Sequence, residues 1–183
     1  MALLEESGWI DADGDGIREK DGEPLTIGHY YRADAGNSNA EAAFLKDNMA
    51  KIGVDVELNG LSRSGYFDAV RSGQHNTQGW WDTGTDPDMV RTFFHSSNAG
   101  GGTNRNNYIN EEMDTMIDAA AAEADPAARC ELYSDIQQKV KDEAIMEFWA
   151  DPVILYAHGN NLNDVVYYLG GNTPYFYMAT VAE

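Results

Sequence analysis

Between Leu25 and Asn59 the sequence reads as a strand, a helix and a second strand joined by very short links. Leu25–Arg32 alternates apolar and polar residues, as a half-buried strand does. Ser38 stands three residues before Glu41, the spacing of a capping box, and an apolar helical face follows as far as Gly53, where the helix should end. Val54–Asn59 alternates again. The pattern predicts a βαβ unit with two parallel strands.

Further elements along the chain fit the same class of fold. A short helix over Tyr66–Ser72 and a strand near Thr77–Trp81 would repeat the first pattern. After a glycine- and asparagine-rich surface loop at Asn98–Asn107, apolar residues recur at helical spacing from Met113 to Ala124. The sequence therefore predicts an α/β fold with a mixed sheet flanked by helices.

A second helix should begin at Asp125-Pro126, because aspartate is a good cap and proline suits the first helical position. We expect these two antiparallel helices to cover one face of the sheet. Beyond Glu143, the apolar segments Ile145–Trp149 and Val153–His158 favour strands.

The charge of the chain excludes several classes of partner. With 31 acidic and 12 basic residues the net charge is −19, which repels nucleic acids and anionic membrane surfaces. The single cysteine, Cys130, cannot form an intramolecular disulfide and is expected to be partly buried in a helix. We find no phosphate-binding loop, nucleophile elbow or metal-ligating histidine spacing, and no secretory leader at Met1.

An aspartate-rich loop early in the chain is the candidate metal site. Asp11, Asp13 and Asp15 take positions one, three and five of an EF-hand-like loop, Gly16 takes position six, and the Ile17 carbonyl and Glu19 fall at seven and nine. Position twelve is a glycine, so the usual bidentate glutamate is absent. The pattern leaves two alternatives open, a weak calcium site and a simple turn between helix and strand.

Read in order, the motifs of the chain resemble the family 5 solute-binding proteins, the group that includes oligopeptide, dipeptide and nickel receptors. The resemblance begins with Gly8-Trp9 and "DGDGIREKDGEPL", and continues through "KIGVDVEL", Tyr66 and "GWWDTGTDPD". It closes with Tyr108–Asn110, Asp114 and "RCELYSDIQQKVKDEA". Each piece is short, and it is their order and spacing that carry the resemblance.

The resemblance implies a two-lobed fold of the class II periplasmic binding-protein type, of which this chain is the C-terminal portion. Residues 1–160 would form the C-terminal ligand-binding lobe, and residues 161–183 would return toward an N-terminal lobe that this chain lacks. It further implies capture of a small-molecule or oligopeptide ligand outside the cytoplasmic membrane, in the periplasm or at the cell surface. The partners would be the membrane subunits of an ABC permease, and no cofactor would be required.

The segment Trp80–Thr83 is the candidate ligand contact. In peptide-binding relatives, a tryptophan and an aspartate three positions later contact the peptide, and the aspartate pairs with its free amine. Trp80 takes the tryptophan position, but counting back from Asp86-Pro87 the aspartate position falls on Thr83, and the acid sits one place earlier at Asp82. This departure leaves sugars, opines and other small solutes open. Trp81 is expected to pack in the core, and Asp86-Pro87 to set up the next helix.

Two other functions compete with solute capture. The first is a calcium-binding structural domain built on the Asp11, Asp13 and Asp15 loop. The second is a hydrolase of peptides or glycans, which only the abundance of acidic and aromatic residues supports.

Overall fold

The computed structural model describes residues 1–79, 84, 86–149, 153, 155–167 and 174–182. These residues fall into two units. Unit 1 comprises Met1–Trp81 and Gly100–Asn107, and unit 2 comprises Asp82–Ala99 and Tyr108–Glu183. None of the described helices combines the length and the apolar character of a membrane span. The division at residue 160 that the resemblance implies stays a prediction.

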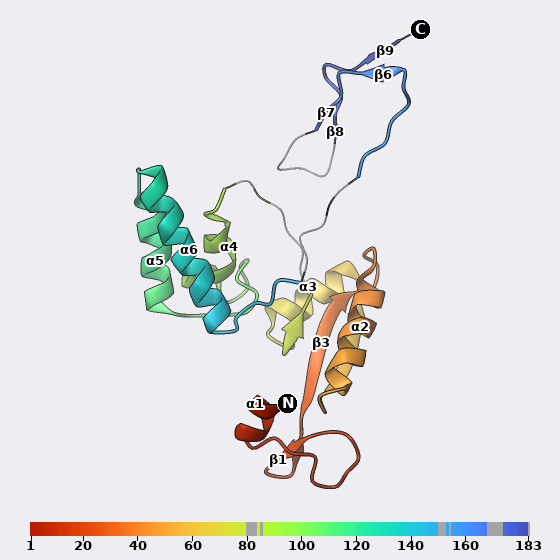
Figure 1. Ribbon diagram of the computed structural model, residues 1–183, viewed down its shortest axis with the longest axis vertical. Helices are drawn as coiled ribbons and strands as arrows, with labels where there is room; N and C mark the ends of the chain where they lie inside the picture. Colours follow the sequence, from red (N-terminus) through yellow and green to blue (C-terminus); the bar gives the residue numbers. More distant parts are fainter. Residues whose placement is uncertain (80–83, 85, 150–152, 154, 168–173, 183) are drawn as a thin grey trace. The chain divides into compact units, whose positions relative to one another are not determined.

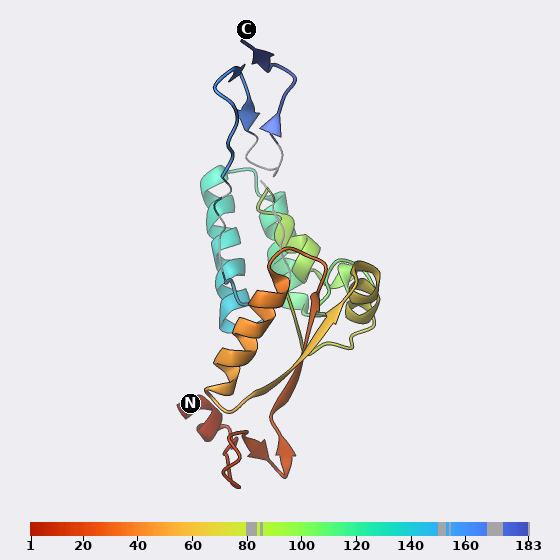
Figure 2. The same cartoon turned by 90° about the vertical axis from the view of Figure 1, so that its right-hand side faces the viewer.

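Unit 1 is built on a three-stranded parallel sheet, which confirms the predicted pair of parallel strands. Strand β3 (Thr26–Arg32) lies between β4 (Asp55–Leu61) and β5 (Thr77–Gln78), and it pairs in parallel with both. Helix α2 (Ser38–Ala50) connects β3 to β4, and α3 (Arg63–Arg71) connects β4 to β5. Strands β4 and β5 lie on opposite sides of β3, so the two connections run in opposite directions across the sheet. Because such connections are right-handed, the two helices cover opposite faces of the sheet (Figures 1 and 2).

The start of α2 differs from its prediction. The residue that caps the helix is Asn37, and its side chain forms no capping hydrogen bond. Ser38 is already the first helical residue, so the capping box expected between Ser38 and Glu41 is wrong. The end of the helix is as predicted, because Gly53 adopts a φ of +80° and its N–H bonds to the Ala50 carbonyl.

Arg18 joins the first part of unit 1 to the end of α2. Helix α1 (Ala2–Glu6) is followed by a hairpin of β1 (Glu19–Lys20) and β2 (Glu23–Pro24). The Arg18 side chain, which is only 7% exposed, donates to the carbonyls of Trp9 and Ile52 at 2.8 Å each. It also forms an ion pair with Glu5 at 3.1 Å. A single buried cation thus satisfies the carbonyls of two loops that are far apart in sequence.

Unit 2 contains a helical cluster of α4 (Met89–Phe94), α5 (Glu111–Ala122) and α6 (Pro126–Asp142). The Asp125 carboxylate caps α6 as predicted, accepting the N–H groups of Ala127 and Ala128. The core of this cluster has seven buried residues: Phe94, Met113, Ile117, Ala120, Tyr133, Ile136 and Val140. Helices α5 and α6 bury their apolar faces against each other and Phe94 of α4, and the expectation that they cover a face of the sheet stays a prediction.

The C-terminal part of unit 2 holds two small antiparallel pairs. Strand β6 (Leu162–Asn163) pairs with β9 (Thr180–Val181), and β7 (Val166–Tyr167) pairs with β8 (Pro174–Tyr175). The strands predicted at 145–149 and 153–158 are wrong for the described residues there, which form none. A strand needs a neighbour for its backbone N–H and C=O groups, and β-prone side chains do not supply one.

One prediction about exposure is wrong. Cys130 is exposed rather than partly buried, and the buried residues of α6 begin only at Tyr133. The predicted loop at Asn98–Asn107 is mostly at the surface, but Asn104 within it is 1% exposed, and residues 100–107 belong to unit 1. Asn106 accepts a hydrogen bond from Gln78 of β5 at 3.3 Å, which ties the loop to the end of the sheet.

Candidate functional site

The candidate ligand segment, Trp80, Trp81, Asp82 and Thr83, lies outside the described residues. Its role therefore stays a prediction, and the structure describes the chain on either side of it. Strand β5 ends at Gln78, two residues before Trp80, so in the sequence the segment follows the carboxyl end of a parallel strand. Open α/β sheets bind their ligands at this edge.

The chain leading into the candidate segment is firmly anchored in unit 1. The hydroxyl of the fully buried Tyr66 lies 2.8 Å from the Gly79 carbonyl and 2.7 Å from the Gln78 side-chain oxygen. Burial raises the pKa of Tyr66 to about 12, so the hydroxyl stays a donor at neutral pH. The Gly79 N–H bonds to the Tyr30 carbonyl at 3.2 Å. The backbone that presents Trp80 is thus fixed one residue upstream.

Two further side chains lie at this end of the sheet. His29 of β3 is buried, and its Nδ1 lies 3.0 Å from the Thr77 hydroxyl. Burial lowers the pKa of His29, which favours the neutral ring at pH 7. Arg32 is the last residue of β3 and pairs with Asp34 at 3.2 Å. Sequence reasoning did not single out Arg32. The feature that could have identified it is a lone positive charge at the carboxyl end of a predicted strand.

The chain that follows the candidate segment is anchored in unit 2. The Asp86 carboxylate accepts the Asp88 N–H at 2.9 Å and pairs with Arg129 of α6 at 3.2 Å. The Asp88 carboxylate accepts from the Tyr133 hydroxyl at 3.0 Å and pairs with Arg91 at 3.1 Å. These contacts fit the structural role predicted for Asp86. They fix the chain on the far side of the candidate segment.

The aspartate loop brings four of the predicted metal ligands together. Carboxylate oxygens of Asp11, Asp13, Asp15 and Glu19 all lie within 4.8 Å of one another. Two oxygens bound to one calcium ion at about 2.3–2.6 Å are at most about 5 Å apart, so this spacing fits calcium. The three aspartates are exposed and Glu19 is half-buried. The spacing rule in the sequence thus found a real cluster.

The same carboxylates already accept backbone hydrogen bonds. Asp11 accepts the N–H groups of Gly14 at 2.7 Å and Gly16 at 3.1 Å. Asp15 accepts the Ile17 N–H at 2.8 Å, and Glu19 accepts the Ala12 N–H at 3.0 Å. The loop therefore holds its shape through its own backbone. Because each carboxylate oxygen has two lone pairs, these bonds leave room for a cation, and calcium binding, including the part assigned to the Ile17 carbonyl, stays a prediction.

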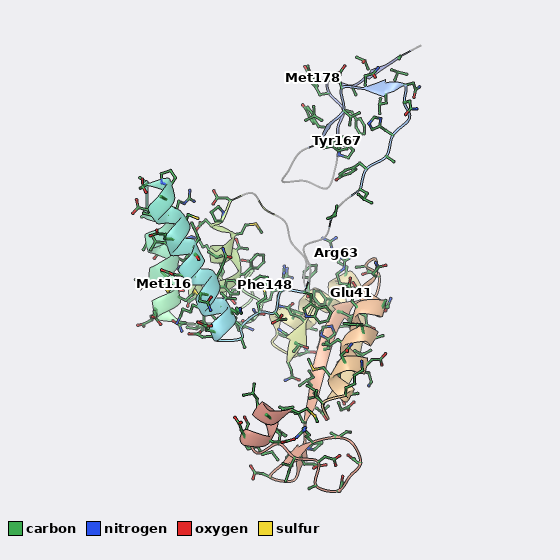
Figure 3. All side chains as sticks on the ribbon, viewed as in Figure 1. Glu41, Arg63, Met116, Phe148, Tyr167 and Met178 are labelled. Atoms are coloured by element: carbon green, nitrogen blue, oxygen red, sulfur yellow. The ribbon has the colours of Figure 1, made fainter. Side chains whose placement is uncertain are left out.

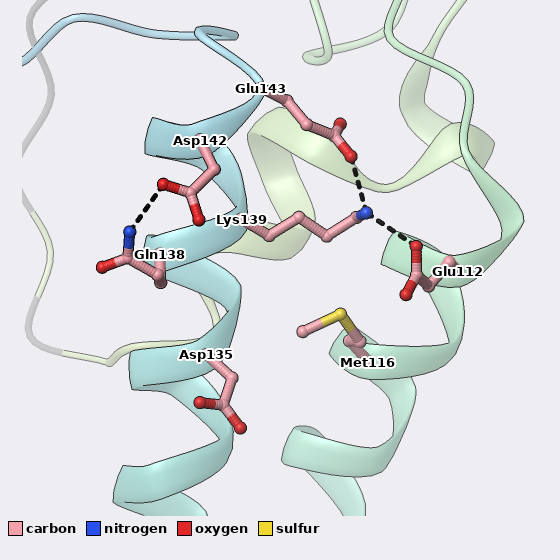
Figure 4. Close-up of a pocket in the computed structure, with 7 residues that line it drawn as sticks. All are labelled: Glu112, Met116, Asp135, Gln138, Lys139, Asp142 and Glu143. Atoms are coloured by element: carbon pink, nitrogen blue, oxygen red, sulfur yellow. Dashed lines mark hydrogen bonds and ion pairs between the residues drawn. The ribbon is translucent and has the colours of Figure 1, made fainter.

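A polar groove lies between α5 and α6 in unit 2 (Figure 4). Lys139 bridges Glu112 of α5 at 2.7 Å and Glu143 at 2.6 Å, and Tyr108 donates to the other Glu143 oxygen. The hydrogen bond from Lys139 lowers the pKa of Glu143, and that from Tyr108 lowers it further. Because Lys139 pairs with both Glu112 and Glu143, we interpret the groove as a structural link between α5 and α6.

The comparisons with known proteins agree with the motifs and with the fold. The sequence pattern of the bacterial extracellular solute-binding proteins, family 5 (middle), matches residues 1–102. The oligopeptide-binding protein AppA of Bacillus subtilis is 28% identical over 176 residues, which cover 91% of this chain and 31% of AppA. The nickel-binding periplasmic protein of Escherichia coli is 31% identical over 154 residues, which cover 79% of this chain and 28% of that protein.

Solved structures show the same fold. AppA from Bacillus subtilis in complex with a nonapeptide aligns over 100% of this chain and 36% of its own, with a TM-score of 0.77 at 23% identity. NikA from Brucella suis in complex with Fe(III)-EDTA aligns over 79% of this chain and 30% of its own, with a TM-score of 0.66 at 26% identity. The chain spans about a third of the length of these relatives. Since the family pattern matches more than half of the sequence, this chain belongs to family 5 of the bacterial extracellular solute-binding proteins.

Proposed function

We propose that this chain is part of the solute-binding component of an ABC importer, which captures a peptide or similar small solute outside the membrane and delivers it to the permease. Membership of family 5 carries this proposal. Its relatives include an oligopeptide-binding protein and a dipeptide-binding protein. The geometry supports it, because the candidate segment follows in sequence the carboxyl end of β5, and α/β folds bind ligands at this edge of their sheets.

We propose a solute with a charged group at each end. Asp82 is the proposed partner of a free amine, and Arg32, the last residue of β3, is a separate candidate partner for a carboxylate. Trp80 supplies apolar contact area. A peptide or an amino-acid derivative carries both end groups, whereas a neutral sugar carries neither.

The proposed role is reversible binding without turnover. The family is one of extracellular binding proteins, and we place the complete protein in the periplasm or at the cell surface. Capture then depends on burial of the solute and exclusion of water, which set the affinity. We propose the permease as the partner that receives the solute.

A thermal-shift screen tests the proposal. The complete product of the gene that encodes this chain is melted with di- and oligopeptides, sugars, opines and nickel chelates. We expect a rise in melting temperature with peptides, because a ligand that binds only the folded state stabilises it. Asp82→Asn should remove that rise, whereas Asp47→Asn, the same change of charge at an exposed position on α2, should keep it.

Two outcomes would change the conclusion. A shift with another solute class and none with peptides would keep solute capture and reject the amine partner at Asp82. If no class of solute shifts the melting temperature, the proposal of solute capture is wrong.

A further inference from the structure

Unit 1 carries a cluster of cations around one aromatic ring, which we call the Arg–Phe patch: Arg63, Phe67, Arg71 and Arg105. The guanidinium carbons of Arg63, Arg71 and Arg105 lie 5.8, 5.4 and 5.1 Å from the centroid of the Phe67 ring. We propose that this patch is a docking surface for an acidic segment of a partner protein.

The helix geometry builds most of the patch. Arg63, Phe67 and Arg71 are spaced four residues apart on α3, so they share one face of the helix. Figure 3 shows Arg63 where α3 begins. Arg105 comes from the loop Gly100–Asn107, which belongs to the same unit and is tied to β5 through Asn106. The patch therefore rests on a helix, and the loop that completes it is anchored.

The concentration of charge is unusual for this chain. Three of its 12 basic residues surround one ring, although the net charge is −19. The ring distances place any two of these guanidinium carbons at most about 11 Å apart, close to the Debye length of about 8–10 Å at moderate salt. Arg63 and Arg71 are exposed, and neither forms an ion pair with a described residue. An incoming anion would relieve their mutual repulsion.

The chemistry of the patch favours carboxylates. A guanidinium presents a planar fork that accepts a carboxylate through two parallel hydrogen bonds. Contact with the Phe67 ring orders the guanidinium groups, and those of Arg63 and Arg71 are exposed, so they are open to a partner. Arginine and aromatic residues are also the types enriched in protein interfaces. A row of glutamate or aspartate side chains can therefore engage several arginines together.

The net charge selects a protein segment over a lipid surface. An extended anionic membrane acts on the whole molecule, and a net charge of −19 would repel it. A short acidic segment is screened beyond about one Debye length, so it responds mainly to the local charge of the patch. The partner that fits is thus small and locally acidic.

Fluorescence anisotropy with labelled hexaglutamate tests the proposal on the intact chain. We expect binding that weakens as salt is raised, and that falls about tenfold in Arg63→Gln/Arg71→Gln, the loss expected from two exposed ion pairs. Lys51→Gln/Lys141→Gln makes the same change in net charge at exposed positions on other elements and should keep the wild-type affinity. Circular dichroism checks that both variants are folded.

Three results would overturn the proposal. The first is equal affinity of the two double variants for hexaglutamate, and the second is no binding by the wild type. The third is patch-dependent binding to phosphatidylserine vesicles with none to hexaglutamate, which would indicate a lipid surface instead. Solute-induced thermal shifts of the Arg63→Gln/Arg71→Gln variant measure solute capture separately, so failure of one proposal does not imply failure of the other.

Discussion

Replacing Gly53 by alanine tests how two separate parts of unit 1 are held together. Gly53 ends α2 with a φ of +80°, a conformation that residues with a Cβ rarely adopt. A Cβ at this position would lie 2.7 Å from Cγ of Arg18. The neighbouring Arg18 cannot easily move aside, because its guanidinium is hydrogen-bonded to the carbonyls of Trp9 and Ile52.

The expected cost has two parts. The left-handed backbone costs alanine about 1 kcal/mol. Displacing Arg18 loses one hydrogen bond or more from a buried charged group, at about 1.5–3 kcal/mol each. With one bond lost, Gly53→Ala should lower the free energy of unfolding by about 2.5–4 kcal/mol. Gly22→Ala is the matched control, since Gly22 has a φ of +85° and open space where its Cβ would be, and it should cost only about 1 kcal/mol.

Urea denaturation followed by circular dichroism and tryptophan fluorescence measures both variants. A double-mutant cycle with Arg18→Ala then isolates the steric contribution, because Gly53→Ala should cost much less once the side chain of Arg18 is gone. Equal destabilisation by Gly53→Ala and Gly22→Ala would refute the reasoning. Strictly additive costs in the cycle would also refute it.

Three further predictions concern the helices and the aspartate loop. Ile117→Ala should lower the free energy of unfolding by about 3–4 kcal/mol in urea, because Ile117 is fully buried; Ile109→Ala, at a 73% exposed position, should change it by less than about 0.5 kcal/mol. The hydrogen bond from Lys139 lowers the pKa of Glu143 from 4.5. The charged Glu143 therefore stabilises the folded chain above pH 4.5, and this stabilisation is lost as pH falls through the lowered pKa. The fall in urea midpoint between pH 7 and pH 3 should therefore be smaller in Glu143→Gln, and an equal fall would contradict this. Calcium at about 100 times its dissociation constant should stabilise the chain by about 2.7 kcal/mol in thermal melts. Asp13→Ala should abolish the effect, and no response in the wild type would reject the cation site.

The elements that sequence reasoning placed correctly carry strong local signals. The alternation in β3 and β4, the glycine at 53 and the Asp125-Pro126 pair each specify their conformation within a few residues, and the structure has all of them. The spacing of the loop aspartates likewise predicted a cluster that the structure confirms. Local signals compete, however, and at the start of α2 the cap is Asn37 rather than Ser38.

The features that sequence reasoning missed depend on contacts between distant residues. Arg18 reaches the Ile52 carbonyl across 34 positions, and Arg105 reaches the Phe67 ring from another part of the chain. The spacing of apolar and polar residues along the sequence carries no information on such contacts. The β-prone residues after Glu143 show the converse, because apolar side chains indicate a strand only where a neighbouring strand exists. The predicted contacts at Trp80 and Asp82 stay predictions, and the anchoring of Gly79 and Asp86 could not be read from spacing.

The return of Gly100–Asn107 to unit 1 means that the chain passes between the two units three times. Neither unit is therefore a continuous stretch of sequence. A fragment that stops at Gly79 would leave Gln78 without its Asn106 partner and would lack Arg105. Unit 1 cannot be isolated by a single proteolytic cut or a simple truncation, and a designed version would have to splice the loop back on. A design that moves unit 1 to another protein must therefore carry residues 100–107 with it or move both units together.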